Sequence, residues 1–244
     1  THIPIPPEVR ALYMTSWVAG TPTLRSSLIN FAVDSEINSI VIDIKDYTGK
    51  VAFETKDELI HEMGSEEKRI PDIAVFIRSL HRQGFYVIGR ISVFQDPHAT
   101  RRKPELAVAS SGGGVWKDRK GLSFIDPGAR EYWDYIVQIA RASEEVGFDE
   151  INFDYIRYPS DGALSLARYP YTKEREKAAV LEEFFKYIDS ALSDLPIPIS
   201  ADVFGLTTWA EDDLGIGQVL ERTAPYFDYV APMVYPSHYD SGFQ

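Results

Sequence analysis

A segment near the middle of the chain combines strand periodicity with charged side chains. Apolar and polar residues alternate there with a period of two, which is typical of a β-strand. The alternating residues are, in order, Glu150, Ile151, Asn152, Phe153, Asp154 and Tyr155. The segment follows an amphipathic helical pattern and precedes a long crossover, so we expect a parallel strand covered on both faces. Carboxylates on such a strand are unfavourable unless they line a cavity or find partners.

Similar strand patterns alternate with helical patterns along the chain. The expected strands are 11–17, 39–44, 85–93, 150–155, 197–203 and 228–235. The expected helices are 22–32, 70–83, 127–146 and about 172–192. Each helical segment has its own start or stop residue, such as Pro22 at a first turn or Gly84 and Gly147 at an end. This rhythm predicts a parallel α/β domain.

The choice between an open sheet and a barrel depends on the turn after the first strand. A doubly wound nucleotide-binding sheet carries a glycine-rich turn there, but residues 18–22 read Val-Ala-Gly-Thr-Pro. Gly112 to Gly114 lie within a loop and do not join a strand to a helix. We therefore expect a single TIM (β/α) barrel domain over residues 1–244. Six βα units are visible, so either two short strands lie in the long loops or the last two units are missing from this C-terminally incomplete chain.

Composition excludes several classes of function. The formal charge is −12, with 37 acidic and 25 basic residues, which disfavours binding to nucleic acids and to anionic membranes. The chain has no cysteine, so it has neither disulfides nor thiolate metal sites. No apolar segment is long enough to span a membrane, and none resembles a signal peptide. Since the first residue is Thr1, we expect that upstream sequence has been removed.

Polar side chains gather at the predicted carboxyl ends of the strands, where α/β enzymes place their chemistry. These residues are Asp43 and Lys45, expected to share one face, and Asp46, Arg90, Ser92, Asn152, Asp154, Arg157, Ser200, Asp202, Tyr235 and His238. Carboxylates thus converge from three separate strands, together with cationic partners.

This set of residues suits the cleavage of glycosidic bonds, which requires one protonated and one ionised carboxyl group. We predict that Asp154 is the ionised group, held by Arg90 or Arg157, and that Asp202 is the acid. The alternative is that these aspartates form internal ion pairs, an interpretation slightly favoured for Asp43 and Lys45. A Mg²⁺ or Ca²⁺ ion bound by the carboxylates of Asp43, Asp46 or Asp154 is a further alternative, although no cofactor is expected.

Aromatic residues at or just after the strand ends support a carbohydrate ligand, because sugar rings stack on aromatic planes. The expected substrate-binding aromatics are Trp17, Tyr158 and Tyr235. Trp116, in the loop after the third strand, is either a lid residue or a loop anchor. The scattered histidines and the absence of a Gly-x-Ser-x-Gly motif disfavour zinc and serine hydrolases.

Five segments carry a resemblance to a known family. They are SFIDP at 123–127, GFDEINFDYIRYP at 147–159, YMTSW at 13–17, VIDIKD at 41–46 and APMVYPSHY at 231–239. They resemble a bacterial family of (β/α)8-barrel glycosyl hydrolases, long catalogued as a domain of unknown function and related to α-amylase-like glycosidases. The resemblance covers nearly the whole chain and implies that Asp154, at the end of strand four, is the nucleophile. It also implies two further strands after Gln244 and an extracytoplasmic or cell-surface location in a bacterium.

The leading hypothesis is a glycoside hydrolase that acts on an oligo- or polysaccharide, with Asp154 as nucleophile or base. One alternative is a non-catalytic glycan-binding barrel of a bacterial surface protein, which keeps the aromatic cleft without a working pair of carboxyl groups. Another is a purely structural surface domain, in which Asp154 is fully occupied by ion pairs.

Overall fold

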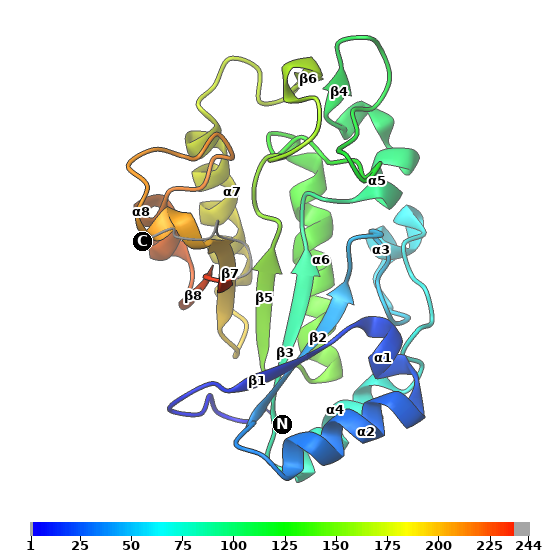
Figure 1. The fold of residues 1–244 in the computed structure, drawn as a ribbon. Coiled ribbons are helices and arrows are strands. Elements are labelled where there is room, and N and C mark those ends of the chain that lie inside the picture. Colours follow the sequence, from blue (N-terminus) through cyan, green and yellow to red (C-terminus); the bar gives the residue numbers. More distant parts are fainter. Residues whose placement is uncertain (1, 237–244) are drawn as a thin grey trace.

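The computed structural model describes residues 2–236, and its main feature is a six-stranded parallel sheet. Its strands are β1 (Ala11–Met14), β2 (Ser39–Lys45), β3 (Tyr86–Ser92), β5 (Glu150–Asp154), β7 (Ile199–Phe204) and β8 (Tyr229–Met233). They are hydrogen-bonded in the order β1-β2-β3-β5-β7-β8, which is also their order in the sequence (Figure 1). A doubly wound sheet reverses direction at its first strand, so this order excludes that topology.

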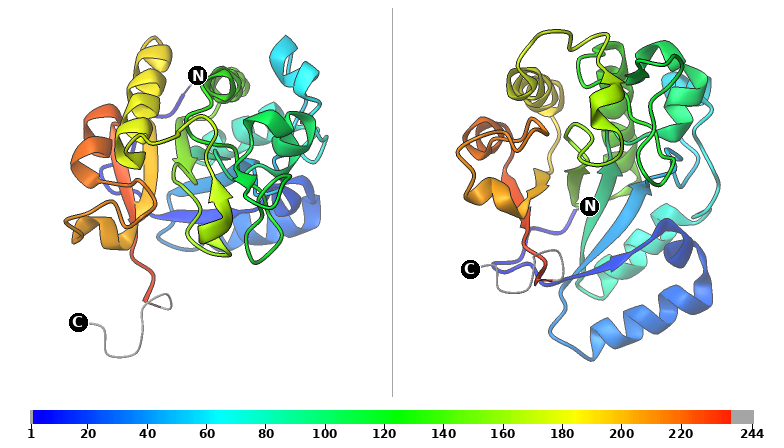
Figure 2. Two further views of the ribbon diagram at one scale, coloured as in Figure 1. Left: turned by 90° about the horizontal axis from the view of Figure 1, so that it is seen from above. Right: turned by 45° about the horizontal axis from the view of Figure 1, so that its top comes forward.

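The sheet winds in one direction only and curls into a half-barrel, with alternating helices around it (Figures 1 and 2). The helices are α1 (Ser16–Gly20), α2 (Pro22–Val33), α3 (Glu58–Met63), α4 (Ile73–Arg82), α5 (Pro97–Arg102), α6 (Glu131–Val146), α7 (Lys177–Leu192) and α8 (Leu220–Thr223). Short 3₁₀ turns lie at Pro104–Leu106, Leu164–Leu166, Gly205–Thr208 and Ala224–Tyr226. The expected partial (β/α) barrel is therefore confirmed. None of the helices in residues 2–236 is long and apolar enough to cross a membrane.

The two faces of the sheet differ in chemistry because side chains alternate along each strand. Apolar side chains on the convex face are buried against the helices, among them Ile42, Val87, Ile91, Ile151, Phe153 and Ala201. Polar side chains, among them Arg90, Asn152, Asp154 and Asp202, line the concave face towards the carboxyl ends of the strands. The hydrophobic core thus holds the strands from outside and leaves the concave face open for a site.

The six predicted strands are observed, with ends shifted by a few residues. The first strand stops at Met14 because the side chain of Thr15 accepts a hydrogen bond from the Val18 amide and begins α1. The helix expected from Pro127 begins at Glu131. Asp126 does not cap it, because its carboxylate accepts hydrogen bonds from the backbone amides of Gly128, Tyr171 and Thr172.

Sequence patterns missed a small antiparallel sheet formed by β4 (Ala109–Ser110) and β6 (Ala167–Arg168). Each strand has two residues, which is too short to give a periodic signal. Trp116 packs edge-on against Phe124 under this sheet, and its indole N–H donates to the Ala163 carbonyl at 3.0 Å. Trp116 therefore anchors the loops above the barrel and does not act as a lid.

Candidate active site

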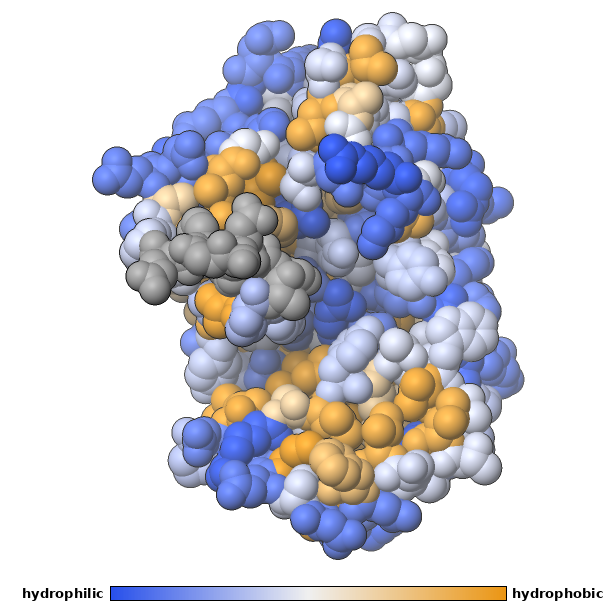
Figure 3. Space-filling model, viewed as in Figure 1, coloured by the Kyte–Doolittle hydropathy of each residue, from blue (hydrophilic) through white to orange (hydrophobic). Residues whose placement is uncertain are grey.

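A cavity of about 860 Å³ occupies the concave face of the half-barrel. Its polar wall is formed by Arg90, Glu150, Asn152, Asp154, Arg157, Ser200 and Asp202. Its apolar wall includes Ile5, Val9, Val41, Ile88, Ala231 and Met233. Figure 3 shows the hollow on this face, with hydrophilic residues in it and hydrophobic residues below it around β1. A cavity with an apolar wall and a few converging polar groups is usual for a ligand site.

Asp154 is the last residue of β5, and its carboxylate faces this cavity. One carboxylate oxygen, Oδ2, accepts hydrogen bonds from Arg90 Nε at 3.1 Å and Nη2 at 2.5 Å. The other oxygen, Oδ1, accepts from the backbone amide of Tyr155 at 2.6 Å. Tyr155 takes a φ of +53°, in the left-handed region that bulky residues rarely adopt. Three donors therefore fix the carboxylate at the end of the strand.

Arg90 joins Asp154 to a second carboxylate. Its Nη1 donates to Asp43 Oδ1 at 2.7 Å, and Asp43 Oδ2 accepts from the Tyr13 hydroxyl at 2.6 Å. We refer to Tyr13, Asp43, Arg90 and Asp154 as the Arg90 cluster. Burial raises the pKa of Asp43, while the Arg90 guanidinium opposes that shift. Burial acts to lower the pKa of Arg90, but the two carboxylates outweigh it and raise the pKa, so Arg90 stays cationic and holds Asp154 in place.

Asp202 lies next to Asp154 on the neighbouring strand β7. Asn152 pairs with Ser200 and Phe153 with Ala201, so one step further along the register brings Asp154 beside Asp202. Asp202 Oδ1 accepts a hydrogen bond from Asn152 Nδ2 at 3.0 Å. Burial and the negative charge of Asp154 raise the pKa of Asp202 to about 7, from an ordinary value of 3.8. The pair thus contains one carboxyl group that keeps its proton near neutral pH.

Glu150 is a third acidic group of the cavity that our sequence analysis did not select. It shares the period-two face of Asn152 and Asp154, so the signal was present in the sequence. Its carboxylate accepts hydrogen bonds from the Ser200 hydroxyl at 2.5 Å and the Tyr86 hydroxyl at 3.0 Å. Burial raises the pKa of Glu150. Its position at the first residue of β5 places it one full strand length from Asp154, deep in the concave face.

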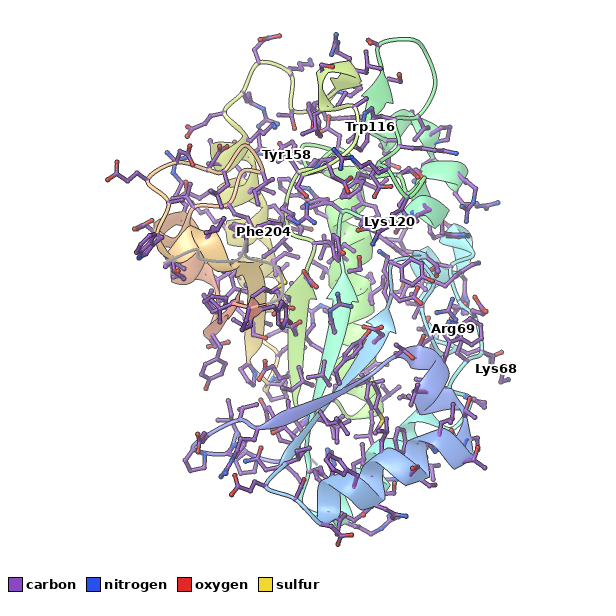
Figure 4. All side chains as sticks on the ribbon, viewed as in Figure 1. Lys68, Arg69, Trp116, Lys120, Tyr158 and Phe204 are labelled. Carbon is purple, nitrogen blue, oxygen red and sulfur yellow. The ribbon has the colours of Figure 1, made fainter. Side chains whose placement is uncertain are left out.

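Arg157 lines the cavity on the loop after β5. Its guanidinium lies 4.9 Å from the ring centre of Tyr155 and 5.0 Å from that of Phe204. Phe204 ends β7, as Figure 4 shows. Of the two arginines expected to hold Asp154, Arg90 therefore does so and Arg157 does not.

The prediction that Lys45 shares a face with Asp43 is wrong. The register of β2 against β3 shifts between these residues, which places Asp43 opposite Arg90 and Lys45 opposite Ile91. This irregularity turns Lys45 away from the cavity, where its ammonium group forms an ion pair with Asp96 at 3.0 Å. Both side chains are completely buried, so Lys45 cannot reach a substrate in the cavity.

Two of the predicted substrate-binding aromatics lie away from the cavity, which corrects their expected positions. Trp17 belongs to α1, where its ring packs on the Arg69 guanidinium at 4.4 Å. Tyr158 is fully buried, and its hydroxyl hydrogen-bonds to the Thr172 hydroxyl at 2.6 Å. In Figure 4, Tyr158 lies above Phe204.

The other predicted residues are at the cavity or outside the described region. Asn152 and Tyr235 line the cavity, whereas His238 lies outside the described residues. Within residues 2–236, no three histidine or acidic side chains are arranged to hold a metal ion. Asp46, one of the candidate metal ligands of the sequence, forms an ion pair with Arg69 at 2.5 Å.

Comparison with known proteins identifies the family of this half-barrel. A family model described as "Putative glycosyl hydrolase domain" matches residues 11–244. The chain belongs to this family. The match to this family model confirms the resemblance found in the strand-end motifs. A search of the curated proteins gives no significant match.

Solved structures support the same fold. A hypothetical protein from Ruminiclostridium thermocellum is 34% identical, with a TM-score of 0.70, over 84% of this chain and 98% of that one. An α-galactosidase from Thermus thermophilus is 12% identical, with a TM-score of 0.56, over 94% of this chain and 44% of its own. A chitobiase from Flavobacterium johnsoniae is 10% identical, with a TM-score of 0.60, over 92% of this chain and 38% of its own. The last two show the fold alone, and the chain spans less than half of each.

Proposed function

We propose that this protein is a glycoside hydrolase that cleaves an oligo- or polysaccharide with the carboxyl groups of Asp154 and Asp202. The observation that carries the proposal is the contrast between these neighbours. Asp154 accepts three hydrogen bonds, two of them from a cation, whereas burial and Asp154 itself raise the pKa of Asp202 to about 7. Glycosidic cleavage requires such a pair, one group ionised and the other protonated.

In this proposal Asp154 acts on the anomeric carbon, either directly as a nucleophile or as a base that activates water. Arg90 donates two hydrogen bonds to a single oxygen, Oδ2, while the Tyr155 amide contacts Oδ1. These contacts set the orientation of the carboxylate before substrate binds, which is the advantage of a preorganised site.

Asp202 then donates its proton to the leaving glycosidic oxygen. Neighbouring parallel strands lie about 4.8 Å apart, so side chains at the ends of β5 and β7 can act on one sugar between them. Asn152 orients Asp202 through its amide, since this hydrogen bond goes to Oδ1 and leaves Oδ2 for the proton and the substrate. After bond cleavage, the ionised Asp202 can accept a proton from the incoming water.

The family description and the glycosidase neighbours support a carbohydrate substrate for this chain. Tyr155, Phe204 and Tyr235 line the cavity and offer aromatic surface for sugar rings. These features leave the sugar and its linkage to experiment.

A direct test incubates the protein with a panel of cell-wall and storage polysaccharides and detects new reducing ends and released oligosaccharides. We expect cleavage of at least one polymer by the wild-type protein and none above background by Asp154→Asn. The two proteins should unfold at similar temperatures. Binding of a glycan by both proteins without any product from either, across pH 4 to 8, would instead establish the non-catalytic glycan-binding alternative.

A further inference from the structure

Arg157 and Arg90 are the two cationic side chains of the cavity wall among residues 2–236, and Arg157 is the one that forms no ion pair there. Only 9% of its surface is exposed, and no carboxylate of residues 2–236 lies within ion-pair distance of it. Arg90, on the same wall, has two such carboxylates. A buried cation without a counter-charge is unfavourable, so its presence beside a candidate active site indicates a ligand.

The hydrogen bonds of Arg157 leave a specific edge of its guanidinium available. Nη1 donates to the Tyr158 carbonyl and to the Ser160 hydroxyl, both at 3.1 Å. Nε and Nη2 have no hydrogen-bond partner among the described residues, yet neither is sealed from solvent. These two nitrogens form the edge with which arginine binds a carboxylate through two parallel hydrogen bonds.

Two aromatic rings fix the orientation of this edge. Tyr155 and Phe204 lie about equally far from the guanidinium carbon, at 4.9 and 5.0 Å from ring centre to carbon. Tyr155 follows Asp154 directly, so the arginine is tied to the same backbone turn as the candidate nucleophile. A group bound by Arg157 would therefore sit on a sugar at the cleavage site or on its immediate neighbour.

The two arginines of the cavity wall differ in their counter-charges. Arg90 is neutralised by Asp43 and Asp154, while Asp154, Asp118 and Asp161 act on Arg157 only at longer range. Burial lowers the pKa of Arg157, which shows that the surroundings disfavour its uncompensated charge. An anionic ligand would remove that penalty, whereas a neutral sugar would not.

We propose that Arg157 is a specificity-determining residue and that the preferred substrate is an acidic glycan, with the carboxylate of a uronic acid or a similar sugar on the Nε and Nη2 edge of this arginine. The proposal rests on the proposed function for its assignment of the site. Its test reads binding and requires no turnover.

The test uses isothermal titration calorimetry with polygalacturonate, alginate and polyglucuronate, each paired with its carboxyl-reduced counterpart of the same length. Asp154→Asn serves as the common background, so that no polymer is consumed. We expect at least one carboxylated polymer to bind about 10- to 100-fold more tightly than its reduced counterpart, as charge-assisted hydrogen bonds allow. Added salt should weaken this preference.

Adding Arg157→Gln should abolish the preference for the carboxylated polymer and leave the affinity for the reduced polymer within about threefold. Arg157→Lys should keep part of the preference, because lysine supplies the positive charge but not the two parallel hydrogen-bond donors of arginine. Arg78→Gln is the matched control. Arg78 is exposed on α4, so this substitution removes the same charge from the outer surface of the protein. This control should keep the full preference.

Three results would overturn the inference. They are equal affinity for every pair of polymers, no binding of any carboxylated polymer, or a preference that survives Arg157→Gln. Failure of the proposed function looks different. In that case no polymer is cleaved by the wild-type protein, whether or not carboxylated polymers bind through Arg157.

Discussion

The Arg90 cluster and the Lys45–Asp96 pair place the same chemistry on two sides of one sheet. Both join a cation to carboxylates at the carboxyl ends of parallel strands. Lys45 and Asp96 are completely buried, whereas the side chain of Arg90 keeps 19% of its surface exposed at the cavity. The Lys45 ammonium also donates to the Ser92 carbonyl at 2.5 Å, and Asp96 caps α5 through the Ala99 amide.

This difference separates a structural ion pair from a candidate catalytic one. Lys45 and Asp96 are joined to the end of β3 through Ser92, to α5 through Ala99 and to α6 through Tyr132, whose hydroxyl donates to Asp96 at 2.7 Å. The Arg90 cluster instead holds Asp154 beside Asp202 on an open wall. We expect changes at Lys45 to affect folding and changes at Asp154 to affect turnover.

The largest expected effect is on turnover in Asp154→Asn. This change keeps the shape of the side chain but removes the negative charge that attacks the sugar or activates water. We expect kcat on a cleaved glycan to fall about 10³-fold or more. Initial rates of reducing-end release measure this, with thermal unfolding as the control for folding. Turnover within tenfold of wild type would place the nucleophile elsewhere.

The next largest effect is expected on stability, at the buried Lys45–Asp96 pair. Lys45→Met leaves Asp96 buried without its cation, so we expect the free energy of unfolding to fall by about 3–5 kcal/mol. Adding Asp96→Asn should recover part of that loss, because no buried charge then remains. Urea unfolding of both variants measures this. Turnover per folded molecule should stay near wild type, and a selective loss of turnover would contradict a purely structural role.

Asp202→Asn tests the pH dependence of the proposed acid. Because the pKa of Asp202 is raised to about 7, the wild-type rate should fall as the pH rises through 7. The variant should be about 10²-fold slower and lack this alkaline limb. A pH–rate profile from 4 to 9 checks both, and an unchanged limb would transfer the acid role to another group such as Glu150.

The same shift predicts a change in stability with a defined sign. Between about pH 4 and 7 the folded protein binds a proton at Asp202 that the unfolded chain has lost, so stability falls as the pH rises through this window. Asp202→Asn should flatten that slope. Thermal unfolding at pH 4, 5.5 and 8 measures it against Asp212→Asn, which changes an exposed aspartate.

The smallest effect is expected for Tyr13→Phe. This variant removes one hydrogen bond to Asp43 and leaves the Arg90 contacts in place. Since a hydrogen bond of this kind contributes about 1–2 kcal/mol, kcat/KM should fall by about tenfold or less. A loss as large as that of Asp154→Asn would mean that Tyr13 contacts the substrate itself.

Much of the fold and part of the site could be predicted from sequence. Period-two alternation placed Asn152, Asp154 and Asp202 on the concave face, because the direction of side chains along a regular strand depends only on their spacing. The same alternation predicted the wrong face for Lys45, because a shift of register is not visible in a single sequence. Tyr13 was missed because its role depends on β2 lying beside β1, which brings its hydroxyl to Asp43.

Local interactions explain what the sequence alone determined. The alternation of β and α segments, the parallel sheet and the polar residues at its carboxyl edge all follow from patterns a few residues long. Only the tertiary structure decided which carboxylate meets which cation. Arg90 pairs with Asp154 and Asp43, and Lys45 pairs with Asp96, whereas Arg157 forms no ion pair within residues 2–236. Electrostatic pairing depends on distances between residues far apart in the chain, and these distances exist only once the strands have docked.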